Sequence, residues 1–295
     1  MELPAPIICR IVANLSGFAY NRGMGIFARY LDDQLSRGRA WFSREEGLRA
    51  LGLSAESFAA AAGRQIRKQR LVSPRQGFYL ILRPEDRIAG APDPVCWIDP
   101  LMKYQGIDYR ISLLSAAAYH GSSHQAAMVF QVIVPRQLRD LEIGGHRLQF
   151  ITQKSALFAK VNRPDWLAQV KSSAGFAAVA GVELTLLDAM RYFHKAAGIN
   201  GVAQIVKDIG GAAGLRKLGE AGKYYENSTV RRLGYLLDLF GHVRQARALE
   251  DCARQAKSSK LLDPSIMELP GLLSRFREKE PRWKLIVNEQ VEADF

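Results

Sequence analysis

The sequence has few cysteines and no long apolar run. Cys9, Cys96 and Cys252 are its three cysteines, and no CxxC pair occurs. This pattern argues against a disulfide framework or a zinc knuckle and is typical of a reducing cytosol. Arg10 interrupts the apolar start PIIC, which argues against a signal peptide. Since no stretch approaches the roughly 20 apolar residues of a membrane-spanning helix, we expect a cytoplasmic protein with no membrane partner.

Signatures of catalysis are also missing. No Gly-x-Ser-x-Gly, HExxH or paired-carboxylate motif is present. The glycine-rich stretches at 20–25 and 210–214 neither follow a clear strand nor continue to Lys-Ser or Lys-Thr, so we interpret them as helix-end loops. His120 and His124 stand four residues apart, but no neighbouring Cys, Asp or Glu completes a metal site. We therefore expect no enzymatic activity, no catalytic residue, no metal and no cofactor.

Positive charge, in contrast, is abundant. The 295 residues include 41 Lys and Arg against 29 Asp and Glu, a net charge of +12. The length and the 48% hydrophobic content suffice for two or three compact domains. Residues 35–83 hold ten basic residues and three acids, more than half of the excess in a sixth of the chain. Such a segment favours a phosphate-rich or otherwise acidic partner.

This basic segment begins with the pattern of two helices. From Phe27 to Leu35, apolar residues recur at helical spacing. Ser43 is followed three residues later by Glu46, the spacing of a capping box at the start of a second helix, which Gly52 would end. Two helices joined by a tight turn that contains glycine are the sequence form of a helix-turn-helix.

A third helix is predicted to begin near Ala55, after the cap Ser54. At about 100° per residue, one side of this helix would face inward. That inner side holds Phe58, Ala62, Ile66 and Gln69. The opposite side holds Ser57, Ala60, Arg64, Arg67 and Lys68. Its small residues would let the helix approach another surface closely, and its long basic side chains could reach phosphates or guanine edges.

The segment LVSPRQGFYLIL, residues 71–82, is typical of two short strands about a turn. Three helices followed by a hairpin predict a winged helix-turn-helix domain that binds double-stranded DNA. The alternative is a solvated helix in a winged module that contacts proteins. The predicted DNA-binding residues are Ser57, Arg64, Arg67, Lys68, Arg70, Arg75 and Gln76, with the last two at the tip of the turn.

Four prolines between residues 83 and 100 prevent a continuous helix or central strand and mark a domain boundary near residue 90. We therefore predict an N-terminal extension at 1–25, the winged helix-turn-helix domain at 26–90 and a C-terminal domain at 91–295. In the C-terminal domain the strand-like runs VFQVIVP and HRLQFIT precede several helical runs, and RWKLIVN is a last strand. The predicted fold class is α+β, with a larger mixed α/β C-terminal domain.

The chain resembles the AbiEi family, the antitoxin half of abortive-infection (type IV) toxin–antitoxin systems. The resemblance covers roughly residues 27–290 and leaves 1–25 outside. It is carried, in order, by RQGFYLILRPEDRIAGAPDP, WIDPLM, YRISLLSAAAYHGSSHQ, VFQVIVP, VELTLLDAMRY, GINGVAQIV, VRRLGYLLDLFG, LLDP and RWKLIVN.

The resemblance implies a winged-helix repressor of the chain's own promoter, usually at inverted repeats, and a C-terminal domain that counteracts a nucleotidyltransferase-like toxin. It implies no enzymatic activity, no cofactor and no obligatory stable complex with the toxin. Arg64, Arg67 and Lys68 match the recognition helix, and Arg75 and Gln76 match the wing tip. We therefore predict a transcriptional autorepressor and antitoxin that acts in phage defence.

Two other functions stay open. A ligand-responsive winged-helix transcription factor would need a closed, partly apolar pocket in its C-terminal sensor domain. A nucleotidyltransferase-like enzyme would need clustered acids that hold magnesium, and we find no such cluster in the sequence. Asp188, a lone acid in the leucine-rich run TLLDAMRY, predicts either a structural partner or exposure.

A second basic cluster lies between residues 244 and 260. Glu250 and Asp251 are interspersed in it, which favours a solvated helix face over a contact with the DNA backbone or the toxin. Tyr224 and Tyr225 are either core residues or interface anchors. The basic residues of the second cluster are Arg244, Arg247, Arg254, Lys257 and Lys260.

Overall fold

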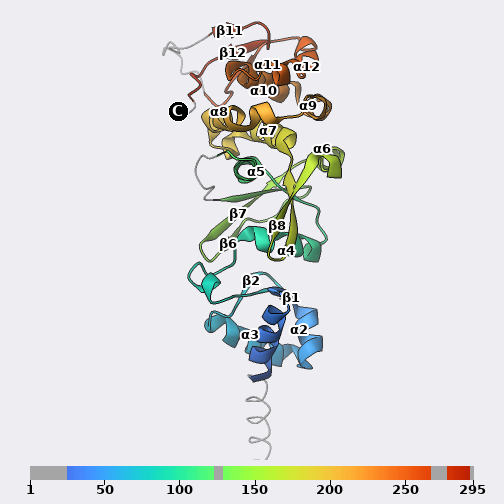
Figure 1. Ribbon diagram of the computed structural model, residues 1–295, viewed down its shortest axis with the longest axis vertical. Helices are drawn as coiled ribbons and strands as arrows, with labels where there is room; N and C mark the ends of the chain where they lie inside the picture. The colour runs from blue at the N-terminus through green and yellow to red at the C-terminus, as the bar shows by residue number, and fades with distance from the viewer. Residues whose placement is uncertain (1–24, 123–128, 267–277, 293–295) are drawn as a thin grey trace, which may run out of the picture. The chain divides into compact units, whose positions relative to one another are not determined.

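The computed structural model describes residues 25–122, 129–266 and 278–292 (Figure 1). The predicted N-terminal extension, apart from its last residue, and His124 lie outside the described residues. The chain divides into two compact units. The first comprises Met1–Gln105, Leu141–His146 and Ser172–Gly175, and the second comprises Gly106–Asp140, Arg147–Lys171 and Phe176–Phe295.

The first unit surrounds a small antiparallel sheet with helices. Its strands pair in the order β1-β3-β2, with Trp41 opposite Leu80 and Arg75 opposite Phe78. The apolar core includes Phe27, Leu31 and Phe58. The elements are a helix over 25–36, β1 (Trp41–Ser43), α2 (Arg44–Leu51), α3 (Ala55–Arg67), β2 (Leu71–Arg75), β3 (Phe78–Ile81), the short 3-10 helices η1 (Glu85–Arg87) and η2 (Pro94–Cys96), and α4 (Ile98–Gln105).

The predicted helix caps of this unit are confirmed. The Ser43 hydroxyl accepts from the Glu46 amide at 3.2 Å, and the Glu46 carboxylate accepts from the Ser43 amide at 2.8 Å. Each side chain thus satisfies an amide that has no partner within the helix. Gly52 ends α2 in the left-handed conformation, with φ at 61°. Ser54 caps α3 by accepting from the Ser57 amide.

The predicted inner face of α3 is partly wrong. Phe58 and Ala62 are buried as expected, but Ile66 is 41% exposed and Gln65 is buried instead. The buried residues of α3 recur at helical spacing along one side of the helix, and they are Phe58, Ala61, Ala62 and Gln65. Gln69, which was also predicted to face inward, lies beyond the helix with φ at 52° and is exposed.

The later part of the proline-rich stretch after β3 is packed within the first unit. Trp97 is 1% exposed, and its indole donates to the Pro92 carbonyl at 2.9 Å. Ile98 and Leu101 of α4 are fully buried. Pro94 starts η2, and Pro100 lies in the first turn of α4, where a missing amide hydrogen breaks no helical bond. The domain boundary near residue 90 stays a prediction.

A six-stranded mixed sheet has the strand order β6-β7-β5-β4-β9-β8, and all of its strands except the edge strand β6 lie mainly in the second unit. Strand β4 pairs antiparallel with β5 and parallel with β9, and β5 pairs parallel with β7, with Val132 opposite Phe150. The strands are β4 (Arg110–Ile111), β5 (Phe130–Val134), β6 (Leu141–Ile143), β7 (His146–Thr152), β8 (Leu167–Ser172) and β9 (Gly175–Ala180).

Most helices of the second unit follow the large sheet in sequence, whereas α5 and α6 lie between its strands in the chain. Helix α7 packs against α5, α8, α9 and α10, and Figure 1 shows α5 and α7 between the sheet and α10. The helices are α5 (Leu113–Tyr119), α6 (Ser155–Val161), α7 (Val182–Arg191), α8 (Gly198–Ile209), α9 (Leu215–Gly222), α10 (Asn227–Leu239), α11 (Val243–Arg247) and α12 (Glu250–Arg254). The unit also contains the 3-10 helices η3 (Pro164–Trp166), η4 (Phe193–Lys195) and η5 (Gly210–Ala212).

A small sheet completes the second unit, with strand order β10-β12-β11. It consists of β10 (Lys260–Leu261), β11 (Glu278–Glu280) and β12 (Leu285–Val287). The predicted α+β fold class is thus confirmed. Among the helices that the structure describes, none is both long and apolar enough to cross a lipid bilayer.

Candidate nucleic-acid interface and a buried polar centre

Helix α3 turns a basic, small-residue face outward. Ser57, Ala60, Arg67 and Lys68 are exposed, and Arg64 is half-buried. Within the described part of the chain, neither Arg67 nor Lys68 forms an ion pair with a carboxylate. The Ser57 hydroxyl accepts from the Ser54 hydroxyl at 3.0 Å, which holds it at the start of the helix. Two positive charges at the end of α3 are therefore accessible to an external anion.

Arg70, the fourth basic residue of this run, has a structural partner. Its guanidinium forms an ion pair with Asp32 and donates to the Ala28 carbonyl at 3.4 Å. Its side chain is 22% exposed. The pair joins the end of α3 to the helix over 25–36, so Asp32 competes with any phosphate for this charge. A DNA contact by Arg70 stays a prediction.

The β2–β3 hairpin has a tip that its surroundings hold in place. Gly77 has φ at 79°, and a Cβ added there would lie 2.4 Å from the Tyr104 hydroxyl oxygen. That hydroxyl donates to the Gln76 carbonyl at 3.3 Å. The Ser73 hydroxyl donates to the Arg75 carbonyl at 2.8 Å. Arg75 is half-buried and Gln76 is exposed. Helix α4 thus supports the hairpin tip through Tyr104.

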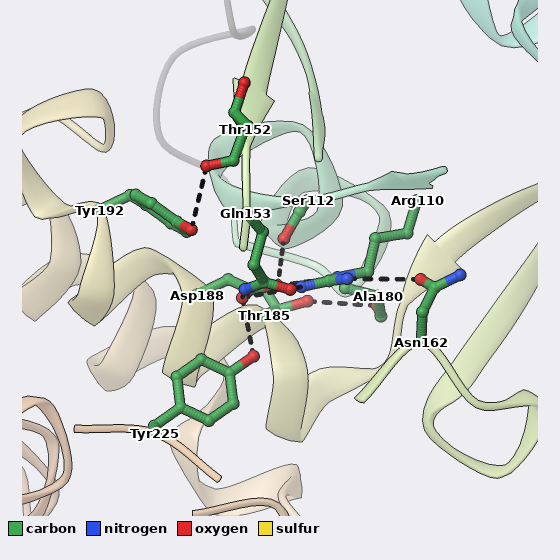
Figure 2. Close-up of polar contacts among 10 residues, drawn as sticks. All are labelled: Arg110, Ser112, Thr152, Gln153, Asn162, Ala180, Thr185, Asp188, Tyr192 and Tyr225. Atoms are coloured by element: carbon green, nitrogen blue, oxygen red, sulfur yellow. Dashed lines mark hydrogen bonds and ion pairs between the residues drawn. The ribbon is translucent and has the colours of Figure 1, made fainter. Parts of the chain in front are cut away.

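The second unit contains a buried polar centre around a charge pair (Figure 2). Arg110 and Asp188 are both fully buried. The Arg110 guanidinium binds the Asp188 carboxylate in bidentate fashion, with Nε 2.9 Å from Oδ2 and Nη2 3.0 Å from Oδ1. The carboxylate also accepts from the hydroxyls of Tyr225 at 2.7 Å and Ser112 at 2.9 Å. Gln153 Oε1 accepts from Arg110 Nη2 at 2.8 Å.

Each partner in this centre comes from a different element. Arg110 is in β4, Gln153 follows β7, Asp188 is in α7 and Tyr225 precedes α10. Asn162, at the end of α6, accepts from Arg110 Nη1 at 3.3 Å. The centre therefore connects the large sheet to the helices that cover it.

The electrostatics of the centre favour a closed structural role. Burial, together with the nearby Asp188 charge, raises the pKa of Tyr225 well above its usual value, so its hydroxyl stays a donor. The Asp188 oxygens accept from donors of Arg110, Ser112, Gln153 and Tyr225. Because the carboxylate is fully buried and surrounded by these donors, it is suited to holding elements together.

These contacts settle two alternatives from the sequence. The prediction of a structural partner for Asp188 is confirmed. Tyr225 is a core residue, whereas Tyr224 is 41% exposed. Sequence reasoning missed Arg110, Gln153 and Asn162. The available signal was an arginine within the apolar run YRISLL, because a buried guanidinium requires an acidic partner.

The structure also places His120 and three residues of the second basic cluster. His120 Nε2 lies 2.7 Å from the Ala180 carbonyl oxygen. In the described ranges, no group of three or more His, Cys, Asp or Glu could hold a metal ion. Arg254 of the second basic cluster pairs with Glu250 at 3.5 Å and Asp251 at 3.4 Å. Lys257 and Lys260 of that cluster instead line a cavity.

Comparison with known structures supports the fold. The chain is similar to the crystal structure of the RV2827C protein from Mycobacterium tuberculosis, with a TM-score of 0.64 and 16% sequence identity. The similarity covers 89% of this chain and 91% of that chain. At this identity the likeness shows a shared fold. No curated protein matches the chain.

A family model described as the AbiEi antitoxin C-terminal domain matches residues 110–239. This range begins at Arg110 and ends with Leu239, the last residue of α10. It includes every residue of the buried polar centre. Residues 110–239 therefore form an AbiEi antitoxin C-terminal domain, as the sequence indicated.

Proposed function

We propose that this antitoxin is also a DNA-binding autorepressor and that its partner toxin is nucleotidyltransferase-like. The antitoxin role, and with it a cognate toxin, follows from the AbiEi domain. DNA binding is proposed for the first unit, as a winged helix-turn-helix domain. The single observation that carries it is the outward basic face of α3, with Arg67 and Lys68 exposed at its end.

The size and order of the elements support this proposal. Helix α3 has 13 residues and is about 20 Å long, and the major groove, about 12 Å wide, admits such a helix. We place Arg64, Arg67 and Lys68 in the major groove. Arg75 and Gln76, on the hairpin that follows, would lie near the backbone or the minor groove. Exposed Ser57 and Ala60 would allow a close approach to the base edges.

Two further assignments refine the proposal. We propose that Arg70 positions α3 through its ion pair with Asp32, and that a phosphate bound by Arg70 would share its guanidinium with Asp32. We also extend the DNA-binding domain from residue 90 to Gln105, because Tyr104 of α4 holds the hairpin tip. The remaining chain would form the antitoxin domain.

A gel-shift assay with the chain's own promoter tests DNA binding. The variant carries Arg67→Ala and Lys68→Ala, and both side chains are exposed, so the fold is expected to survive. Each lost phosphate contact lowers the slope of log affinity against log salt by about 0.9. We expect weaker binding and a salt slope smaller by about 2.

The matched control removes two positive charges elsewhere in the same unit. Arg87 is exposed, and the Lys103 side chain is 77% exposed, so Arg87→Ala with Lys103→Ala changes the net charge equally. The control should bind the promoter almost as tightly as the unaltered chain. Equal losses in both variants would show that only overall charge matters and would refute the docking of α3. Protection of cells that express the toxin should be kept in both variants.

A ligand-responsive transcription factor is the second candidate. A cavity of about 130 Å³, lined in part by Trp41, Arg83, Cys96 and Trp97, lies in the first unit and not in the C-terminal domain where this candidate requires its pocket. This volume is below the roughly 300–1,000 Å³ of typical ligand pockets, so we rank this candidate lower. A neighbouring gene for a nucleotidyltransferase-like protein would favour the toxin–antitoxin assignment, and promoter affinity that changes with a small molecule would favour the sensor.

A further inference from the structure

A basic cavity of about 450 Å³ lies in the second unit, at the start of α10. Three of its lining residues are cations, four are neutral polar residues and one is alanine, and none is an acid. The lining residues are Asn227, Ser228, Arg231, Gln255, Ala256, Lys257, Ser258 and Lys260. The cavity thus combines a formal charge of +3 with several hydrogen-bonding side chains.

The start of α10 adds a favourable field. The helix runs for 13 residues from Asn227, and its first amides have no acceptor within the helix. Backbone dipoles place partial positive charge at this end, where anions bind. The N-cap residue Glu226 makes no side-chain capping bond, and its carboxylate forms an ion pair with Arg191. The Glu226 carboxylate therefore accepts no capping hydrogen bond from the first amides of α10.

Arg231 supplies an independent sign of an anionic ligand. The residue is 2% exposed, and its Nη1 donates to the carbonyls of Ser258 and Lys284, each at 2.9 Å. Its buried Nε has no hydrogen-bond acceptor among the described residues. Burial lowers the pKa of Arg231, which reflects the energetic cost of a buried positive charge. A buried guanidinium held only by neutral carbonyls is stabilised by a nearby anion.

The two acids that precede the cavity segment 255–260 are engaged with other arginines. Glu250 pairs with Arg254 at 3.5 Å and also with Arg282, and Asp251 pairs with Arg254 at 3.4 Å. The cavity wall is also fixed. Arg231 holds the Ser258 carbonyl, and the Lys284 ammonium donates to the Ala256 carbonyl at 2.6 Å. The site is thus formed before any ligand binds.

We propose that this cavity binds the phosphate group of a nucleotide. The first amides of α10 and the Ser228 hydroxyl would bind phosphate oxygens, and Lys257 and Lys260 would balance their charge. The volume lies within the range of small-molecule sites, so the cavity has room for the attached nucleoside beside Gln255. The site needs no part of the first unit and is independent of the proposed DNA binding.

Isothermal titration calorimetry on the full chain in a phosphate-free buffer tests the site. The probes are inorganic phosphate, adenosine 5′-monophosphate and adenosine. We expect one bound molecule of phosphate or of the nucleotide, tighter binding of the nucleotide, and no heat from adenosine. Binding of inorganic phosphate alone would overturn the nucleotide assignment. Absence of binding by both phosphate compounds would overturn the site itself.

Variants then locate the binding. Lys257→Ala with Lys260→Ala should weaken nucleotide binding about tenfold or more, the factor for one lost charge-assisted hydrogen bond. Ser228→Asp should weaken it similarly, while an acid in the first turn favours the helix and preserves the fold. The charge-matched control is Arg244→Ala with Arg247→Ala, two exposed residues outside the cavity lining. Equal weakening in the control would overturn the proposal.

Discussion

The Arg110–Asp188 pair allows a quantitative prediction about the antitoxin domain. Asp188→Asn keeps the shape of the side chain but replaces one acceptor oxygen by a donor and removes the negative charge. Oδ1 accepts from Arg110, Gln153 and Tyr225, and Oδ2 accepts from Arg110 and Ser112. In either orientation the new NH2 group therefore faces an Arg110 N–H, and the buried guanidinium loses its counter-charge.

The magnitude follows from this loss. Breaking a fully buried ion pair by removing one partner costs about 3–5 kcal/mol of folding free energy. The expected loss is a large part of the about 5–15 kcal/mol that stabilises a typical domain. Arg110→Met should cost a similar amount, because it leaves the carboxylate buried and unpaired. Once one partner is missing, loss of the other removes little more, so the double variant should be far less unstable than additivity predicts.

Urea denaturation read by hydrogen–deuterium exchange of peptides from β4 and α7 measures these changes. The matched control is Thr185→Val, because the fully buried Thr185 hydroxyl makes only a neutral bond to the Ala180 carbonyl at 3.2 Å. The control should lose about 1 kcal/mol. If Asp188→Asn cost no more than Thr185→Val, or if the two ion-pair substitutions were additive, the assignment of the centre as a coupled structural unit would be refuted.

Two other substitutions test further features of the chain. Burial and Asp188 raise the pKa of Tyr225 well above its ordinary 10.0, so the folded chain should lose stability as the pH rises through about 10. Tyr225→Phe, which cannot ionise, should lose less stability over that range in urea unfolding. Gly77→Ala should destabilise the first unit by about 1–3 kcal/mol, because φ is 79° and the new Cβ approaches the Tyr104 hydroxyl. Thermal unfolding measures this loss, and adding Tyr104→Phe to Gly77→Ala should recover part of the lost stability. If the double variant recovered none, Tyr104 would not support the hairpin tip.

The features of the first unit that sequence predicts well are local. A capping box joins residues three positions apart, and Gly52 ends α2 through its own backbone conformation. The hairpin of β2 and β3 turns within two residues. Strand β1 was missed because it has three residues and exists only through pairing with β3, where Trp41 lies opposite Leu80. Such pairing depends on closing a long loop, which short patterns do not encode.

In the second unit as well, local elements were predicted from the sequence, whereas the pairing of distant strands was not. The apolar runs at β5 and β7 predicted strands, and helical runs were expected after them. The sheet order was not predictable, because β4 lies between β5 and β9, one antiparallel and one parallel. Parallel neighbours need a long crossover, so their identity depends on how distant segments pack.

The choice of partner for Arg110 shows where sequence reasoning stops. Two acids of α7, Glu183 and Asp188, lie in an apolar helix, and each needs a partner when buried. They are five residues apart, which places them about 140° apart around the helix. Glu183 accepts from the Gly214 amide at 2.7 Å, near the start of α9, and Asp188 meets Arg110 of the sheet. Composition and spacing predict that an arginine and an acid pair, but the rotation of α7 on the sheet decides which acid does so.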